Sequence, residues 1–150
     1  MDAIDRRLLA ELQRDARVSL NELSRRINLS APAVATRVRR LEHVGVITGY
    51  HAHVDPAAAG RGVVALVRMN CYGPGCLLRR DADTVREWPE VLQVHRVTGD
   101  ACCLLMVAVA TMADFQVLID RLAEHGKPSS TMVLSSPVAW RPVEPPDVSV

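Results

Sequence analysis

Three arginines lie close together in one short basic segment of the sequence, at positions 37, 39 and 40. A guanidinium group can bind a phosphate, and it can also donate two parallel hydrogen bonds to the edge of a guanine. Thr36 precedes them and can contact a thymine methyl group or a polar base edge, while a side chain as small as Ala33 lets a helix approach the floor of a DNA groove. These residue types predict a DNA-contacting segment, for which the candidates are Ser30, Ala33, Thr36, Arg37, Arg39 and Arg40.

Charge is distributed unevenly along the 150 residues, although the formal net charge is only +1. Residues 1–50 hold nine arginines and six acidic residues, whereas the remainder carries a small net negative charge. The first third of the chain is therefore the natural candidate for contact with a polyanion. With 49% hydrophobic and 23% charged residues, no apolar run of membrane-spanning length and no leader-like apolar core, the sequence predicts a cytoplasmic protein with no membrane partner.

Other residues with chemical potential do not form a recognisable catalytic or metal-binding pattern. His51 and His53 share one face of an expected strand but lack an evident third ligand, so solvated histidines are the default interpretation. The four cysteines match no zinc spacing and are expected to act as small buried hydrophobic residues; they are Cys71, Cys76, Cys102 and Cys103. Without a Ser/His/Asp set, a phosphate loop or paired carboxylates, we expect no catalytic residue, no metal, no cofactor and no enzyme activity.

Local patterns predict three helices that would position the basic segment. Asp2 is a suitable N-cap for a helix over residues 2–14. Ser19 and Glu22 form a capping-box pattern, which starts a second helix that ends near Asn28. Ser30 then caps a third helix that runs to about His43. Two short helices joined by a tight turn are typical of a helix-turn-helix unit.

The third helix divides into a buried side and an outward side at 100° per residue. Val34, Val38 and Leu41 fall within about 60° of one another and form the buried stripe. The outward side carries small, polar and basic side chains, and Arg39 lies on its flank; these outward residues are Ala33, Thr36, Arg37 and Arg40. This arrangement predicts that the third helix reads the major groove.

The second half alternates between strands and helices. The predicted elements are a strand at Gly62–Tyr72, a helix at Leu77–Trp88, strands at Val91–Thr98 and Cys102–Ala110, a helix at Met112–His125 and a strand at Ser130–Trp140. This order is that of a ferredoxin-like βαββαβ domain. Both faces of the sheet are expected to be apolar, so the face without helices should pack on a second copy of the chain.

The overall prediction is an α+β protein with an N-terminal helix-turn-helix domain, which can be of the winged type, followed by a ferredoxin-like domain. The predicted boundaries are residues 1–45 for DNA binding, 46–60 for a β-rich linker, 61–141 for ligand sensing and oligomerisation, and 142–150 for a C-terminal tail.

The sequence resembles the Lrp/AsnC family, the leucine-responsive and asparagine-operon regulators, over nearly its whole length. The resemblance is carried by D-x-x-D-R-x-L-L-x-E-L-Q at Asp2–Gln13, and by L-S-x-x-x-V-x-x-R-V-R-R-L-E-x-x-G-V-I-x-G-Y at Leu29–Tyr50. The strings P-E-V-L-x-x-H-x-V-T-G-D at Pro89–Asp100 and M-V-L-S at Met132–Ser135 are also similar to that family.

The resemblance implies a sequence-specific DNA-binding transcription regulator that forms homodimers or an octamer built of dimers. It also implies an effector pocket between subunits for an amino acid or a related small molecule. Carried over to this sequence, the pocket residues would be Thr98, Gly99, Asp100, Ala101 and Ser130. The family usually continues after V-T-G-D with an aromatic residue and an acid, whereas this chain has Ala101-Cys102 and lacks both groups.

Two other functions are compatible with the same architecture. Sirohaem decarboxylases resemble it and use the ferredoxin-like half for tetrapyrrole chemistry, but such an enzyme has no need for Ala33, Thr36, Arg37 and Arg40 on one helix face. A DNA-organising protein that works without an effector is the other alternative, and screening amino acids for binding separates it from a regulator.

Overall fold

The computed structural model describes residues 1–72, 85–138 and 140–145. The chain divides into two units, the first containing Met1–His53 together with the segment that begins at Val138, and the second containing Val54–Pro137. No helix of the described residues has both the length and the apolar character needed to cross a membrane.

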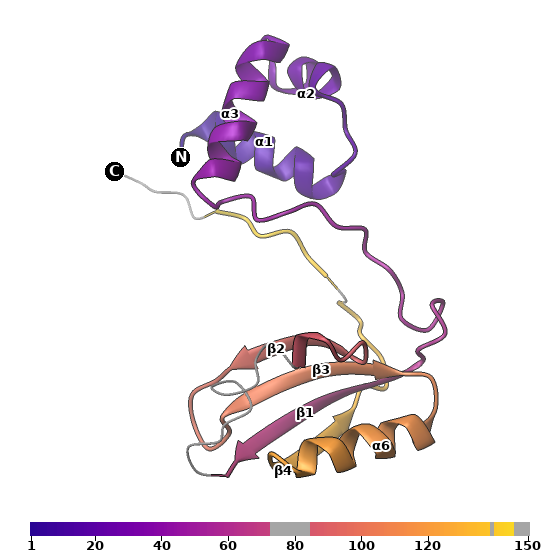
Figure 1. Cartoon of the computed structure of the whole chain (residues 1–150). Helices are drawn as coiled ribbons and strands as arrows, with labels where there is room; N and C mark the ends of the chain where they lie inside the picture. Colours follow the sequence, from indigo (N-terminus) through magenta and orange to yellow (C-terminus); the bar gives the residue numbers. More distant parts are fainter. Residues whose placement is uncertain (73–84, 139, 146–150) are drawn as a thin grey trace. The chain divides into compact units, whose positions relative to one another are not determined.

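Three helices build the first unit: α1 (Ala3–Arg14), α2 (Leu20–Ile27) and α3 (Ala31–His43) (Figure 1). Their apolar stripes meet in one core, which confirms the predicted buried side of α3; the core residues are Leu8, Leu9, Leu12, Leu23, Ile27, Val34, Val38 and Leu41. Asn28 ends α2 in the left-handed conformation at φ 58°, as the helix-to-helix turn requires. The described part of this unit contains helices but no β-hairpin wing.

The caps of the first two helices differ in part from the sequence-based expectation. Ser19 accepts a hydrogen bond from the backbone N–H of Glu22 at 3.2 Å, but the Glu22 carboxylate does not return to the cap and instead pairs with Arg26 at 3.0 Å. The reciprocal capping box lies at α1, between Asp2 and Asp5. A nearby guanidinium offers the Glu22 carboxylate a charged donor, which is a stronger partner than a backbone amide.

The segment that begins at Val138 packs on the first unit through α1. The side-chain amide of Gln13 donates to the Val143 carbonyl at 3.0 Å, and its oxygen accepts from the Val143 N–H at 2.8 Å. Trp140, Val143 and Pro145 line a cavity of about 770 Å³ together with residues of α1 and of the segment that follows α3. The 46–60 linker was expected to be β-rich, but none of its residues lies in a strand.

The second unit is a four-stranded antiparallel sheet in the order β2-β3-β1-β4. Its elements are β1 (Val63–Cys71), β2 (Val91–Arg96), β3 (Cys103–Val109), α6 (Met112–Ala123) and β4 (Gly126–Met132). Figure 1 shows α6 lying along one face of the sheet, and the strand order and pairing are those of a ferredoxin-like domain. Most of the predicted helix Leu77–Trp88 falls outside the described residues, but its end contributes Val85 and Trp88 to the core.

The last strand was predicted wrongly at Ser130–Trp140 and runs instead from Gly126 to Met132. The predicted strand began only after Gly126 and Pro128, which are residue types that interrupt regular structure in most contexts. Gly126 pairs with Cys71, and a Cβ at this position would lie only 2.5 Å from the Asn70 carbonyl oxygen, so glycine is needed for close strand contact. Pro128 is tolerated because β4 is an edge strand.

Candidate nucleic-acid interface

The outward face of α3 carries an open hollow of about 620 Å³. The hollow is lined by Asp2, Pro32, Ala33, Thr36, Arg37 and Arg40. The structure therefore brings four of the six predicted DNA-binding residues together on one surface. It adds two residues that were not predicted, Pro32 of α3 and Asp2 from the start of α1.

Ser30 and Arg39 flank this hollow. Ser30 is the N-cap of α3, and its hydroxyl accepts a hydrogen bond from the Ala33 N–H at 3.4 Å. Arg39 is exposed and makes no hydrogen bond or ion pair with any residue that the structure describes. Thr36 is also exposed, and its hydroxyl donates to the Pro32 carbonyl at 3.0 Å, so its methyl group and its oxygen lone pairs are what it can offer to DNA.

Arg37 and Arg40 do not extend freely into solvent. Nη1 of Arg37 lies 2.7 Å from an oxygen of Asp2 and 2.8 Å from an oxygen of Asp5, and Nη2 of Arg40 lies 2.6 Å from the other Asp5 oxygen. The Asp5 side chain is completely buried, while 28% of the Arg37 and 51% of the Arg40 side chain remains exposed. Two carboxylates of α1 thus hold the two principal arginines of α3.

Asp2 and Asp5 both have lowered pKa values, so the charged form that makes the ion pairs is favoured. Burial by itself would raise the pKa of Asp5, but the hydrogen bond from the Asp2 backbone N–H, together with the guanidinium groups of Arg40 and Arg37, lowers that pKa to about 2. The Asp5 backbone N–H and, after it, the Arg37 side chain lower the pKa of Asp2 as well. Both acids are therefore charged at neutral pH, and together they balance the two arginines.

Asp2 was predicted only as the N-cap of the first helix, and the part that Asp2 and Asp5 play in this surface was not predicted. The pattern D-x-x-D is a local sign of helix capping, and nothing local connects it with residues 32 to 35 positions further along the chain. Only the packing of α1 against α3 places these carboxylates beside Arg37 and Arg40.

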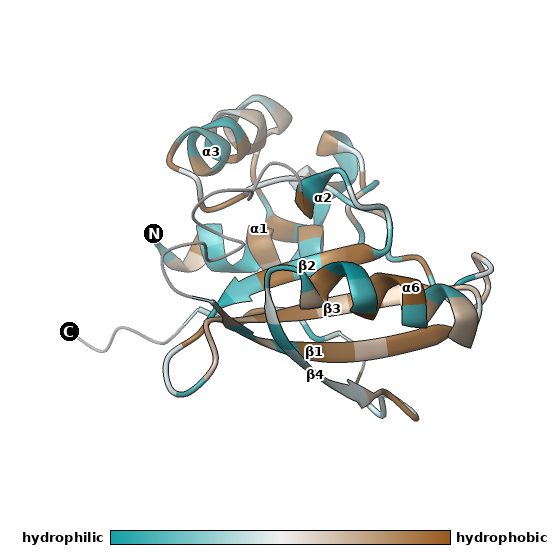
Figure 2. Ribbon diagram, turned by 60° about the horizontal axis from the view of Figure 1, so that its bottom comes forward, coloured by the Kyte–Doolittle hydropathy of each residue, from teal (hydrophilic) through white to brown (hydrophobic). Residues whose placement is uncertain are grey.

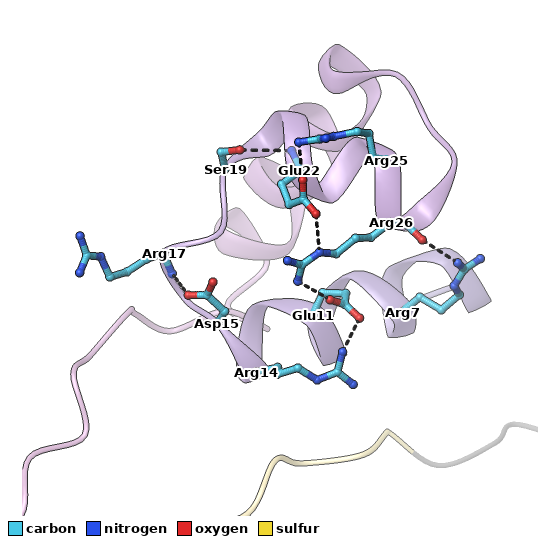
Figure 3. A network of polar contacts seen from close by, with 9 residues as sticks. All are labelled: Arg7, Glu11, Arg14, Asp15, Arg17, Ser19, Glu22, Arg25 and Arg26. Atoms are coloured by element: carbon cyan, nitrogen blue, oxygen red, sulfur yellow. Dashed lines mark hydrogen bonds and ion pairs between the residues drawn. The ribbon is translucent and has the colours of Figure 1, made fainter.

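A second group of arginines, on α1 and α2, is also bound to acids (Figure 3). Glu11 pairs with Arg14 and with Arg26, each at 2.8 Å, and thereby ties α1 to α2. Glu22 pairs with both Arg25 and Arg26. Glu11 and Glu22 largely balance the charges of these arginines. Arg39 on α3, by contrast, has no acid partner among the described residues.

The predicted effector residues lie in the second unit on separate strands. Thr98, Gly99 and Asp100 are exposed in the turn between β2 and β3, where Gly99 has φ +97°, and Ala101 follows them half-buried. Ser130 is on β4 and pairs with Val67 of β1, so β1 lies between it and β3. One chain therefore does not bring Ser130 into contact with the turn.

The cysteines and histidines do not assemble a metal centre among the described residues, which contain no group of three or more potential ligands. Cys103 is buried in the core of the second unit. The Cys102 sulfur accepts a hydrogen bond from the backbone N–H of Cys71 at 3.4 Å, and Cys76 lies outside the described residues.

Comparison with known proteins yields matches over most of the chain. Residues 1–42 match the AsnC-type helix-turn-helix domain, and residues 76–143 match the Lrp/AsnC ligand binding domain. The HTH-type transcriptional regulator LrpA of Mycobacterium tuberculosis is 36% identical over 139 residues, which are 91% of this chain and 91% of that protein. The leucine-responsive regulatory protein of Rhizobium meliloti is 37% identical over 117 residues, 77% of this chain and 75% of the relative.

Solved structures agree with these sequence matches. The feast or famine regulatory protein of M. tuberculosis, complexed with L-methionine, has a TM-score of 0.87 at 35% identity and covers 96% of this chain and 99% of its own. LrpC of Bacillus subtilis has a TM-score of 0.85 at 28% identity, with 91% and 96% covered. These relatives are named as regulators, which does not favour the tetrapyrrole enzyme considered from the sequence. The chain belongs to the Lrp/AsnC family of DNA-binding transcription regulators.

Proposed function

We propose that this regulator reads DNA with the outward face of α3 and that an amino acid bound in the second unit controls it. The observation that carries the proposal is the hollow on α3, where Arg37 and Arg40 keep unused guanidinium donors beside the small and polar side chains of Ala33 and Thr36. Ser30 and Arg39 are exposed on the same helix and would contact phosphates. Because the expected partner is double-stranded DNA, the protein would work in the compartment that holds the chromosome.

Two copies of the chain would present two such helices to a roughly palindromic site. Support for a homodimer comes from the face of the sheet opposite α6, where the alternation of β1 and β3 places apolar side chains that the single chain leaves at least partly exposed; these are Val64, Leu66, Leu104 and Met106. Figure 2 shows the hydrophobic character of both central strands. Leu66 remains 37% exposed in the single chain. Apolar surface of this kind is typically covered by another chain.

Replacing Leu66 by lysine is expected to weaken self-association at least tenfold. The substitution would place a charge in the proposed sheet-to-sheet contact, where it would lose its hydration without gaining a partner. Sedimentation velocity at several protein concentrations measures the change and also reports whether dimers assemble into octamers. Val117→Lys is the matched control because Val117 is 67% exposed and lies on α6, on the other side of the sheet. Equal association of wild type and Leu66→Lys would show that this face is not the interface.

The proposed effector is an amino acid that contacts the β2–β3 turn of one subunit. Asp100 is exposed there and can pair with an ammonium group, while the Gly99 backbone N–H can donate to a carboxylate. The relative complexed with L-methionine supports this class of ligand. Thr98 and Ala101 would line the same site, with Ser130 supplied from β4. The absence of an aromatic residue and an acid after Asp100 predicts a ligand contact different from that of family members with these groups.

Thermal unfolding with each of the twenty L-amino acids should identify the ligand. At a concentration about 100 times the Kd, binding to the native state would add about 2.7 kcal/mol and raise the Tm by several degrees. Asp100→Asn should abolish that shift, whereas Asp120→Asn, which changes an exposed acid of α6, should preserve it. No shift with any amino acid would instead favour a DNA-organising protein without an effector, and an unchanged shift in Asp100→Asn would exclude the turn as the site.

A further inference from the structure

The ion pairs between α1 and α3 use only part of each guanidinium group. Arg37 contacts Asp2 and Asp5 through Nη1 alone, and Arg40 contacts Asp5 through Nη2 alone. An arginine has five N–H donors, so the remaining nitrogens of both side chains have donors left for a second acceptor. A base edge can therefore bind while the contacts to the carboxylates persist.

The carboxylates are themselves fixed by the α1 capping box. Oδ1 of Asp2 accepts from the Asp5 N–H at 2.8 Å, and Oδ2 of Asp5 accepts from the Asp2 N–H at 3.0 Å. Asp5 is completely buried beneath the arginines, whereas the Asp2 side chain is 52% exposed at the edge of the hollow. The first helix thus supplies a rigid frame of two anionic groups, one under the arginines and one beside them.

This frame changes what DNA encounters at α3. A phosphate is attracted by net positive charge, but Arg37 and Arg40 are balanced here by Asp2 and Asp5, and the exposed Asp2 would repel a phosphate that approached Arg37. A base edge recognises the direction of donors more than net charge. The ion pairs therefore weaken sequence-independent attraction while they hold the donors in one orientation.

We propose that Asp2 and Asp5 are positioning residues that orient Arg37 and Arg40 toward base edges and suppress their binding to phosphates of non-operator DNA. The acids thereby lower overall DNA affinity and raise the ratio of operator to non-operator affinity, because specificity depends on the difference between the two. The proposal rests on the assignment of α3 as the DNA-reading helix.

Asp2→Asn is the informative substitution. Asparagine is as good an N-cap as aspartate, and its oxygen can still accept from the Asp5 N–H, so α1 should remain intact. Asp15→Asn is the matched control, since it removes one carboxylate charge from the same unit while its oxygen can still accept from the Arg17 N–H, and Asp15 does not line the hollow on α3. Asp2→Glu retains the charge.

The experiment measures the affinity of the full-length protein for two duplexes of equal length across a series of salt concentrations. One duplex is an operator selected by this protein from random sequences, and the other is a non-operator sequence. Asp2→Asn should tighten non-operator binding about three- to tenfold and should steepen its salt dependence by about the slope of one phosphate contact. The affinity for the operator should increase by a smaller factor. Asp2→Glu should restore the lower non-operator affinity. Damage to the fold would weaken operator binding, so a gain on non-operator DNA with operator binding retained reports on a folded protein.

Three outcomes would overturn the proposal. Asp15→Asn could produce the same change, which would show an effect of net charge alone. Asp2→Asn could weaken binding to both duplexes equally, which would indicate only a structural role. Alternatively, Asp2→Asn could leave the affinity for both duplexes unchanged while Arg37→Ala still weakens operator binding. If neither Asp2→Asn nor Arg37→Ala alters any DNA binding, the assignment of α3 as the reading helix fails as well, so the two failures are distinguishable.

Discussion

Replacing Arg37 or Arg40 by alanine should weaken operator binding about 10- to 100-fold in each case. A guanidinium that donates to a base edge contributes about 1–3 kcal/mol of discrimination, and each substitution would also leave a carboxylate of α1 with one fewer cationic partner near the DNA. Because Asp2 and Asp5 already balance the charge of both arginines, we expect the affinity for non-operator DNA to fall less than the affinity for the operator. For the same reason, we expect only a small change in the salt dependence of binding. Mobility-shift titrations on both duplexes at several salt concentrations measure these quantities.

Arg39→Ala is the matched control for those substitutions. Arg39 is on the same helix and exposed, but no acid among the described residues pairs with it. If Arg39 contacts a phosphate, its loss should weaken binding to both duplexes about equally. It should also reduce the slope of log K against log salt concentration by about one. Unchanged operator affinity in Arg37→Ala and Arg40→Ala would remove the hollow on α3 from the DNA interface.

The sequence was most informative where local chemistry determines structure. Ser19, Asn28 and Ser30 mark the ends of α2 and α3 because a cap acts on backbone groups within a few residues. The period of Val34, Val38 and Leu41 also sets which face of α3 remains outward, and the structure agrees. These are short-range properties, so a single sequence contains them.

Features that depend on packing between distant segments could not be obtained in this way. The β4 strand was misplaced because Gly126 and Pro128 are breakers in most contexts and suit a strand only beside the close backbone of β1 and at a sheet edge. The contact of Gln13 with Val143 spans 130 positions and has no local pattern. The pairing of Asp5 with Arg37 and Arg40 is of the same kind, and it changes the interpretation of the candidate site most.

Asp5 should make the stability of the first unit depend on pH in a defined range. Its pKa falls from an ordinary value of 3.8 to about 2 in the folded protein: burial opposes the fall, but the Asp2 N–H and the guanidinium groups of Arg40 and Arg37 outweigh it. A lowered pKa means that the stabilisation is complete above pH 3.8 and is lost as the pH decreases toward about 2. The difference corresponds to about 2 kcal/mol of unfolding free energy.

Asp5→Asn should therefore lower the unfolding free energy at pH 7 by about 2 kcal/mol, less than for a fully buried ion pair because both arginines retain contact with solvent. In the wild type, protonation of Asp5 contributes to the loss of stability between about pH 4 and pH 2. The variant has no carboxylate to protonate at this position, so its stability should fall less over that range. Urea unfolding followed by helical circular dichroism measures both effects, and an NMR titration of the Asp5 carboxyl carbon measures its pKa directly. Asp15→Asn should unfold like the wild type, because its carboxylate has no guanidinium partner among the described residues. If Asp5→Asn instead follows the wild-type pH dependence, Asp5 does not hold the arginines as a charged group, and the orientation of Arg37 and Arg40 must have another cause.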